Sequence, residues 1–205
     1  MKFQFDESTA SGWAELTATP IDFDAFPPVG RLRVQWPLGE QSIDRIALAA
    51  SLVFSPWIAG RCDLPKPFSA LTNQRITEWF QNQGIWVTPA PVRAGGLPLP
   101  RGQHTFEIVD GERRTEHSGL ILAPALAGSG PSTAGMRIAS NLDSLAAFVD
   151  SPAHRHLIRL GAAVLVAESL AINVLHYPAF ADECPDDFAA ASRLLECAAL
   201  GLHHD

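Results

Sequence analysis

The stretch that decides how the second half of the chain folds reads Met136-Arg137-Ile138-Ala139-Ser140-Asn141-Leu142-Asp143-Ser144-Leu145-Ala146-Ala147-Phe148-Val149. Its first four residues predict a short strand, its polar middle predicts a turn, and its apolar end predicts a helix. At such a junction the N–H groups that begin the helix are free to receive a phosphate. The same polar residues also suit simple helix capping by Ser140, Asn141 or Asp143, which requires no ligand.

Residues 139 to 148 resemble the pyrophosphate-binding loop of the ATP pyrophosphatases, the PP-loop proteins, whose motif is SGGxDS. Leu142, Asp143 and Ser144 match the xDS end of that motif, and residues 139 to 141 replace Ser-Gly-Gly. The superfamily includes 7-cyano-7-deazaguanine synthase, asparagine synthetase and the tRNA-thiolating enzymes. Residues 172 to 177 resemble the second strand of the family, and residues 188 to 204 resemble the helix that follows it. The resemblance thus covers roughly residues 136 to 205.

This resemblance implies a partial, HUP-like α/β region with a parallel sheet over residues 127 to 205, and ATP with Mg²⁺ as ligands. It places Ser140, Asn141, Asp143 and Ser144 around the ATP phosphates. In the family, a carboxylate or carbonyl oxygen is adenylated and pyrophosphate is released. Both glycines of the motif are missing, although glycine is what lets a backbone approach a phosphate closely. We therefore expect a degenerate version of the site found in 7-cyano-7-deazaguanine synthase. The resemblance identifies no catalytic residue and no protein metal ligand in this chain.

A second interpretation is a non-catalytic interaction or regulatory subunit that keeps an enzyme-derived fold. The altered loop favours it, as does the lack of basic residues beside the loop other than Arg137. Its partner would be another protein or further copies of this chain. A nucleotide-binding protein should bind Mg·ATP and lose that binding in Asp143→Ala, whereas an interaction subunit should ignore ATP and expose a large apolar patch.

Residues 1 to 126 predict an α+β region. Alternating polar and apolar residues predict strands over 2–6, 12–19 and 31–36, and apolar periodicity predicts a helix over 43–54 capped by Ser42 and another over about 68–83. Ile85-Trp86-Val87 is expected to form a short buried strand, with Trp57 and Trp86 in the core. The Pro- and Gly-rich residues 88 to 102 are expected to form a loop or linker.

Two further patterns concern the middle of the chain. Residues 104–109 and 117–122 flank Asp110-Gly111, a strong turn dipeptide, and predict a hairpin. A stretch rich in Gly, Ser and Pro then precedes a change to an Ala- and Leu-rich sequence. We place a boundary between the two regions near residues 126 to 135.

Two polar clusters lie in the last third of the chain. His154 and His156 are two residues apart, so on a helix they point in different directions and suit a single metal ion poorly. The acidic run from Asp182 to Asp187 precedes a predicted helix, where Asp186 and Asp187 favour the helix N-terminus. A Mg²⁺ ion beside bound ATP is the alternative role for this run.

Composition limits the classes of function. The chain has 205 residues, with 15 Lys and Arg against 22 Asp and Glu, which gives a net charge of −7. Binding to duplex nucleic acid is disfavoured because it relies on neutralising phosphates. No apolar window is long enough for a membrane span, and the charged N-terminus is unlike a signal peptide, so a cytoplasmic protein that does not bind membranes is expected. Cys62, Cys184 and Cys197 are far apart, which argues against a disulfide framework and a structural zinc site.

Overall fold

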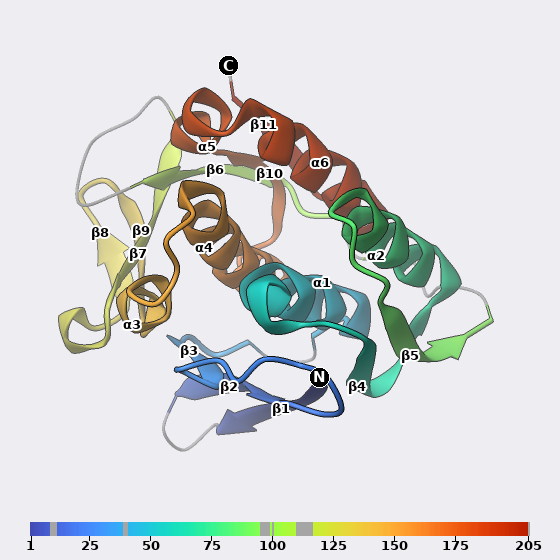
Figure 1. Ribbon diagram of the computed structural model, residues 1–205. Helices are drawn as coiled ribbons and strands as arrows, with labels where there is room; N and C mark the ends of the chain where they lie inside the picture. Colours follow the sequence, from blue (N-terminus) through green and yellow to red (C-terminus); the bar gives the residue numbers. More distant parts are fainter. Residues whose placement is uncertain (9–11, 39–40, 95–98, 100, 110–116, 205) are drawn as a thin grey trace.

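The computed structural model describes residues 1–8, 12–38, 41–94, 99, 101–109 and 117–204. The protein has a mixed α/β fold built on one large sheet (Figure 1). The strands are β1 (Lys2–Ser8), β2 (Trp13–Thr19), β3 (Arg31–Gln35), β4 (Arg61–Ser69), β5 (Thr88–Arg93), β6 (His104–Val109), β7 (Ser118–Pro124), β8 (Gly130–Ser132), β9 (Gly135–Ser140), β10 (Ile172–His176) and β11 (Gly201–His203). The helices are α1 (Ile43–Phe54), α2 (Ala70–Asn82), α3 (Leu142–Ala146), α4 (Pro152–Val166), α5 (Pro178–Glu183) and α6 (Pro185–Leu195), with 3₁₀ turns η1 (Ser55–Trp57), η2 (Ala125–Ala127) and η3 (Glu196–Ala198).

The sheet follows the order β11-β10-β6-β7-β9-β3-β2-β1-β4-β5, and β8 pairs with β9. The N-terminal strands β1, β2 and β3 pair antiparallel, and β3 also pairs antiparallel with β9. The strands from β9 to β11 in this order are parallel to one another. The parallel sheet expected for the C-terminal region is therefore confirmed, and the sheet continues without a break across the predicted boundary near residues 126 to 135.

The core lies between the curled sheet and two central helices. The strands wrap around α1 and α4, which pack against each other, and α2 and α6 cover the side between β5 and β11 (Figure 1). The helix predicted over 43–54 is confirmed as α1, which is buried along nearly its whole length. Helices connect two of the parallel crossovers in the C-terminal half: α3 and α4 lie between β9 and β10, and α5 and α6 lie between β10 and β11.

Three local predictions are wrong. Residues 85–87 form no strand, and Trp86 is exposed rather than in the core. The strand in this part of the chain is β5, which lies inside the Pro-rich stretch that was expected to be a loop. Residues 104–109 and 118–124 are strands as predicted, but they pair parallel, which a hairpin cannot do. The predicted turn at Asp110-Gly111 lies outside the described residues. Residues 201–203 form β11 instead of closing a helix.

No helix in the described part of the chain combines the length and apolar character needed to cross a lipid bilayer.

Candidate functional site

The predicted phosphate loop is a strand–turn–helix junction. Strand β9 ends at Ser140, Asn141 occupies the N-cap position, and α3 begins at Leu142, three residues earlier than the expected start of the helix. Asn141 has φ −100°, so the turn is made without the left-handed backbone that the family's glycines permit. The junction is therefore present, although its helix has only five residues.

Two of the four predicted site residues have side chains that bind the protein itself. The Oγ of buried Ser140 donates a hydrogen bond to the carbonyl of Ala123 at 3.3 Å. The amide of Asn141 bridges to β3: its Oδ1 accepts from the N–H of Arg33 at 2.7 Å, and its Nδ2 donates to the carbonyl of Arg31 at 2.9 Å. These bonds join β9 to β7 and β3, and phosphate binding by these two side chains would break them.

Asp143 and Ser144, the other two predicted residues, are exposed on the first turn of α3. The N–H of Ser144 donates to the carbonyl of Asn141 at 3.1 Å, as in an ordinary helix start. The junction lies where the parallel strands meet the antiparallel strand β3. Ser140, Asn141, Asp143 and Ser144 thus lie close together, but their contacts fit triphosphate and Mg²⁺ poorly.

A different position in the sheet has the topology of a ligand site. Strand β6 lies between β10 and β7, and all three are parallel. After β6 the chain continues to β7 on one side, and after β10 it continues to β11 on the other side. The connections therefore leave the carboxyl ends of the neighbouring strands β6 and β10 in opposite directions, which opens a crevice between these two ends.

The crevice at the carboxyl ends of β6 and β10 has a volume of about 300 Å³. It is lined by Glu107, Ile108, Val109, Tyr177, Pro178, Ala179 and Asp182, which come from β6, from the end of β10 and from α5. Two acidic residues, Glu107 and Asp182, thus line a space whose walls are about equally polar and apolar. Among the described residues, those that line the crevice include neither lysine nor arginine. This chemistry favours a ligand with a flat apolar part and hydrogen-bond donors.

One wall of the crevice is fixed by a chain of three polar side chains. The hydroxyl of Tyr177 lies 2.8 Å from Nδ1 of His156, and Nε2 of His156 lies 3.1 Å from a carboxylate oxygen of Glu183. An ionised carboxylate only accepts, so the Nε2 position carries the proton and Nδ1 accepts from the hydroxyl. Burial raises the pKa of Tyr177 to about 12, which keeps this donor protonated at neutral pH.

His156 also stacks on Phe180. Their ring centroids are 5.1 Å apart and the ring planes are inclined by 18°. His156 is on α4 and Phe180 is on α5, so the stacked pair and the Glu183–His156–Tyr177 chain hold α5 against α4. Both ring nitrogens of His156 are thus engaged by protein groups.

Three histidines lie beside the crevice. The ring of His176 is 4.0 Å from that of His117 and 5.7 Å from that of His203, measured between centroids. His176 is also the register partner of Glu107 across the β10–β6 pair. Within the described residues, no three His, Cys, Asp or Glu side chains are arranged to hold a metal ion.

The sequence missed the two carboxylates that line the crevice. Glu107 is an isolated acidic residue in a strand, and Asp182 belongs to the acidic run assigned to a helix start. Asp186 and Asp187 do lie in the first turn of α6, as predicted. The sequence did contain a signal for this crevice: the polar residues His176 and Tyr177 end the stretch 172–177, just before a helix. A strand followed directly by a helix places its last residues at the edge of the sheet, where ligands bind.

Comparison of the chain with models of protein families, with curated proteins and with solved structures gives no match.

Proposed function

We propose that the protein is a degenerate relative of the ATP pyrophosphatases that binds an adenine nucleotide through its adenosine part in the crevice between β6 and β10. The observation that carries the proposal is the strand order β11-β10-β6-β7-β9 with the crevice at its switch point. Numbered along the chain and read from β9 to β11, these five parallel strands have the order 3-2-1-4-5. This is the order of doubly wound nucleotide-binding sheets, of which the HUP-like fold is one form. The resemblance at residues 139 to 148 supports the family relationship alone, because these residues lie at the end of β9, two strands away from β6.

The lining of the crevice determines which part of a nucleotide it would hold. Ile108, Val109 and Pro178 offer apolar surface to a purine ring, and Glu107 and Asp182 can accept hydrogen bonds from the ring amine or the ribose hydroxyls. The same carboxylates repel a polyphosphate. At about 300 Å³, the crevice is at the lower end of the range of roughly 300–1,000 Å³ for ligand sites, which suits a nucleoside.

Binding without turnover is the form of this function that the side chains support. The family chemistry requires positive charge or tight backbone contacts around the phosphates. Here Ser140 and Asn141 bond to neighbouring strands, and the described crevice lining has no basic residue. We therefore propose a nucleotide-binding protein in which pyrophosphate release has been lost.

Thermal shift titrations with adenosine, AMP and ATP, each with and without Mg²⁺, test this function. A ligand that binds only the folded state at about 100 times its Kd stabilises it by about 2.7 kcal/mol. Adenosine and AMP are expected to raise Tm more than ATP, and Mg²⁺ alone is expected to have no effect. Ala179→Trp fills the crevice from an exposed position and should abolish the shift.

Two control variants locate the binding. Asp143→Ala removes a residue of the predicted loop, and Ala125→Trp adds an exposed indole on η2, away from the crevice; both should keep the wild-type shift. A shift that is largest with Mg·ATP and lost in Asp143→Ala would instead assign binding to residues 140 to 144. The absence of any shift with all three ligands would overturn nucleotide binding.

The second candidate is the non-catalytic interaction or regulatory subunit. The observation that favours it is the exposure of large aromatic side chains, with Phe23, Phe26 and Trp86 all more than three-quarters exposed. A protein that fails the nucleotide titration and forms a stable complex through these residues would have this function.

A further inference from the structure

A second crevice lies toward the carboxyl ends of β1 and β4, and β7, β9, β3 and β2 separate it in the sheet from the crevice between β6 and β10. Its volume is about 270 Å³, and we call it the β1–β4 crevice. Its apolar lining comes from β1, β4 and the first turn of α1 and includes Phe5, Ile43, Ile46 and Pro65. Its polar lining includes Glu7, Gln41 and Lys66. Apolar surface combined with a few polar groups is typical of a site for a small molecule.

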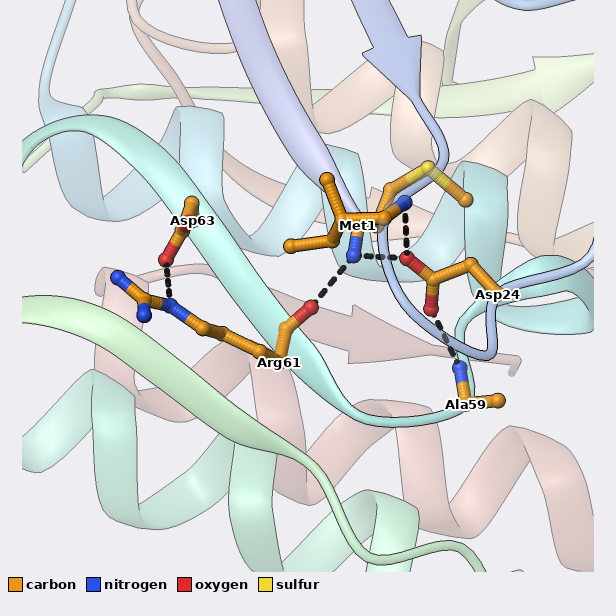
Figure 2. A network of polar contacts seen from close by, with 6 residues as sticks. Met1, Asp24, Ala59, Arg61 and Asp63 are labelled. Atoms are coloured by element: carbon orange, nitrogen blue, oxygen red, sulfur yellow. Dashed lines mark hydrogen bonds and ion pairs between the residues drawn. The ribbon is translucent and has the colours of Figure 1, made fainter.

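The β1–β4 crevice opens because the two parallel strands are joined at their beginnings and separate further along. The α-amino group of Met1 donates to the carbonyl of Arg61 (Figure 2), and the carbonyl of Met1 accepts from the N–H of Asp63 at 2.8 Å. In the described part of the chain, the ladder between β1 and β4 consists of one register pair, Lys2 with Asp63. Beyond it, the start of α1 lines the space between the strands. The chain leaves β1 for β2 and leaves β4 for β5, on opposite sides, and such positions are where α/β sheets bind ligands.

Lys66 brings a positive charge to the β1–β4 crevice. It lies between Pro65 and Pro67, in the part of β4 where the register with β5 shifts between Asp63 and Phe68. Proline fixes its own φ angle and restricts the residue before it, so the backbone around Lys66 has little freedom. The side chain is exposed, and no hydrogen bond or ion pair joins it to another residue in the described part of the chain. Its ammonium group can therefore pair with a carboxylate in the crevice.

Glu7 and Gln41 bring acceptor oxygens to the same crevice. Both side chains hold Leu38: a carboxylate oxygen of Glu7 accepts from its N–H at 2.9 Å, and Nε2 of Gln41 donates to its carbonyl. A carboxylate has about four acceptor sites, so Glu7 can hold Leu38 and the ammonium group of a ligand together. Oε1 of Gln41 is buried and accepts no hydrogen bond within the described residues. Because buried acceptors normally have a donor, an ammonium group beside Gln41 would supply the one that is missing.

We propose that the β1–β4 crevice binds a free amino acid with an aliphatic side chain. Lys66 holds its carboxylate, Glu7 and Gln41 hold its α-ammonium group, and the apolar lining covers its side chain. At about 270 Å³, the crevice lies just below the range of roughly 300–1,000 Å³ for ligand sites, so it suits a molecule of the size of leucine. A lining with one charge of each sign complements a zwitterion better than a ligand with a single charge. This inference does not depend on the proposed nucleotide binding.

Isothermal titration calorimetry with three molecules of similar shape tests the proposal. Leucine carries both charges, 4-methylpentanoate lacks the ammonium group, and 3-methylbutylamine lacks the carboxylate. Leucine is expected to bind, and each of the other two should bind about tenfold more weakly or worse, because it leaves one charged group of the crevice without its partner. Equal binding of the three molecules overturns the proposal, as does a failure of leucine to bind at millimolar concentration.

Variants of the two charged residues assign the ends of the ligand. Lys66→Met should weaken the binding of leucine about tenfold and leave that of 3-methylbutylamine unchanged, a pattern that loss of folding does not produce. Glu7→Gln keeps an oxygen for the N–H of Leu38 and should weaken leucine and 3-methylbutylamine but not 4-methylpentanoate. Lys2→Met, which removes an exposed lysine at the start of β1, is the matched control and should bind leucine like the wild type. Unchanged leucine binding in Lys66→Met overturns the proposal, and loss of leucine binding in Ala179→Trp overturns it by placing the ligand in the other crevice.

Discussion

Gly161 of α4 lies so close to Val53 of α1 that a methyl group on the glycine would be 2.5 Å from Cγ2 of the valine. The same methyl group would lie 3.1 Å from the carbonyl oxygen of Ala49. The two central helices therefore approach each other at a position where only a hydrogen atom fits. Because the sheet wraps around this helix pair, the separation of α1 and α4 sets the spacing of the whole core.

Gly161→Leu should lower the free energy of unfolding by about 3 kcal/mol, since overpacking in a core typically costs roughly 1–3 kcal/mol and occasionally more. Urea denaturation measures the change. Gly60→Ala is the control, because no atom lies within 4 Å of the added methyl group. A Gly161→Leu variant as stable as Gly60→Ala would show that the helices separate without cost.

Asp24→Asn should destabilise the fold by about 3 kcal/mol or more, because it leaves the buried ammonium of Met1 without its opposite charge. The urea midpoint would fall while the slope with denaturant stays constant. Asp22→Asn is the matched control in the same loop. Asp22 is exposed with φ 51°, a conformation that asparagine also adopts, so its stability should match the wild type. Equal stability of the two variants would contradict a stabilising role for the ion pair.

The three cysteines should differ in their reactivity with Ellman's reagent at pH 8. Burial raises the pKa of Cys62 to about 12 and that of Cys197 to about 11, so both remain thiols in the folded protein. Cys184 is partly exposed, and desolvation followed by the nearby Asp187 and Glu183 raises its pKa, so it should react slowly but first. Cys184→Ser should remove reaction under native conditions, and a remaining native phase would contradict the burial of the other two.

His154 should make stability fall as the pH drops from 7 to 5. Burial lowers the pKa of His154 in the fold, although Asp187 opposes the shift. The unfolded chain then binds a proton near pH 6.5 that the folded chain does not, so stability is present above that pH and lost below it. His154→Asn should flatten the dependence of the urea midpoint on pH, whereas the exposed His204→Asn should leave it unchanged. An identical pH profile in both variants would refute the role of His154.

Local patterns in the sequence predicted the elements whose own residues alternate or repeat with a clear period. The helix predicted over 43–54 has an apolar stripe, although the side chain of Ser42 at its N-cap makes no capping hydrogen bond. The strands predicted over 2–6, 12–19 and 31–36 alternate, the second of them weakly. By contrast, β4 and β5 were missed because each contains two prolines. Pro65 and Pro67 fall where the β4–β5 register shifts between Asp63 and Phe68, so no ladder hydrogen bond is required of them.

The crevice could not be predicted because its parts are distant in the sequence. Glu107 and Asp182 meet only because β10 pairs with β6, and strand patterns carry no information about which strands pair or in which direction. The same limitation explains the hairpin that proved to be a parallel pair. The positions of Ser140 and Asn141 at a strand–helix junction were predicted, but their bonds to β7 and β3 depend on strand neighbours that only the fold reveals.

The ends of the sheet offer little backbone to a further strand. β5 ends the order on one side and contains Pro89 and Pro91, which have no N–H to donate, and β11 ends it on the other side with three residues. β8, which pairs only with β9, is equally short and includes Pro131. Extension of the sheet from one molecule to the next is therefore disfavoured, and the folded protein should resist growth into cross-β fibrils.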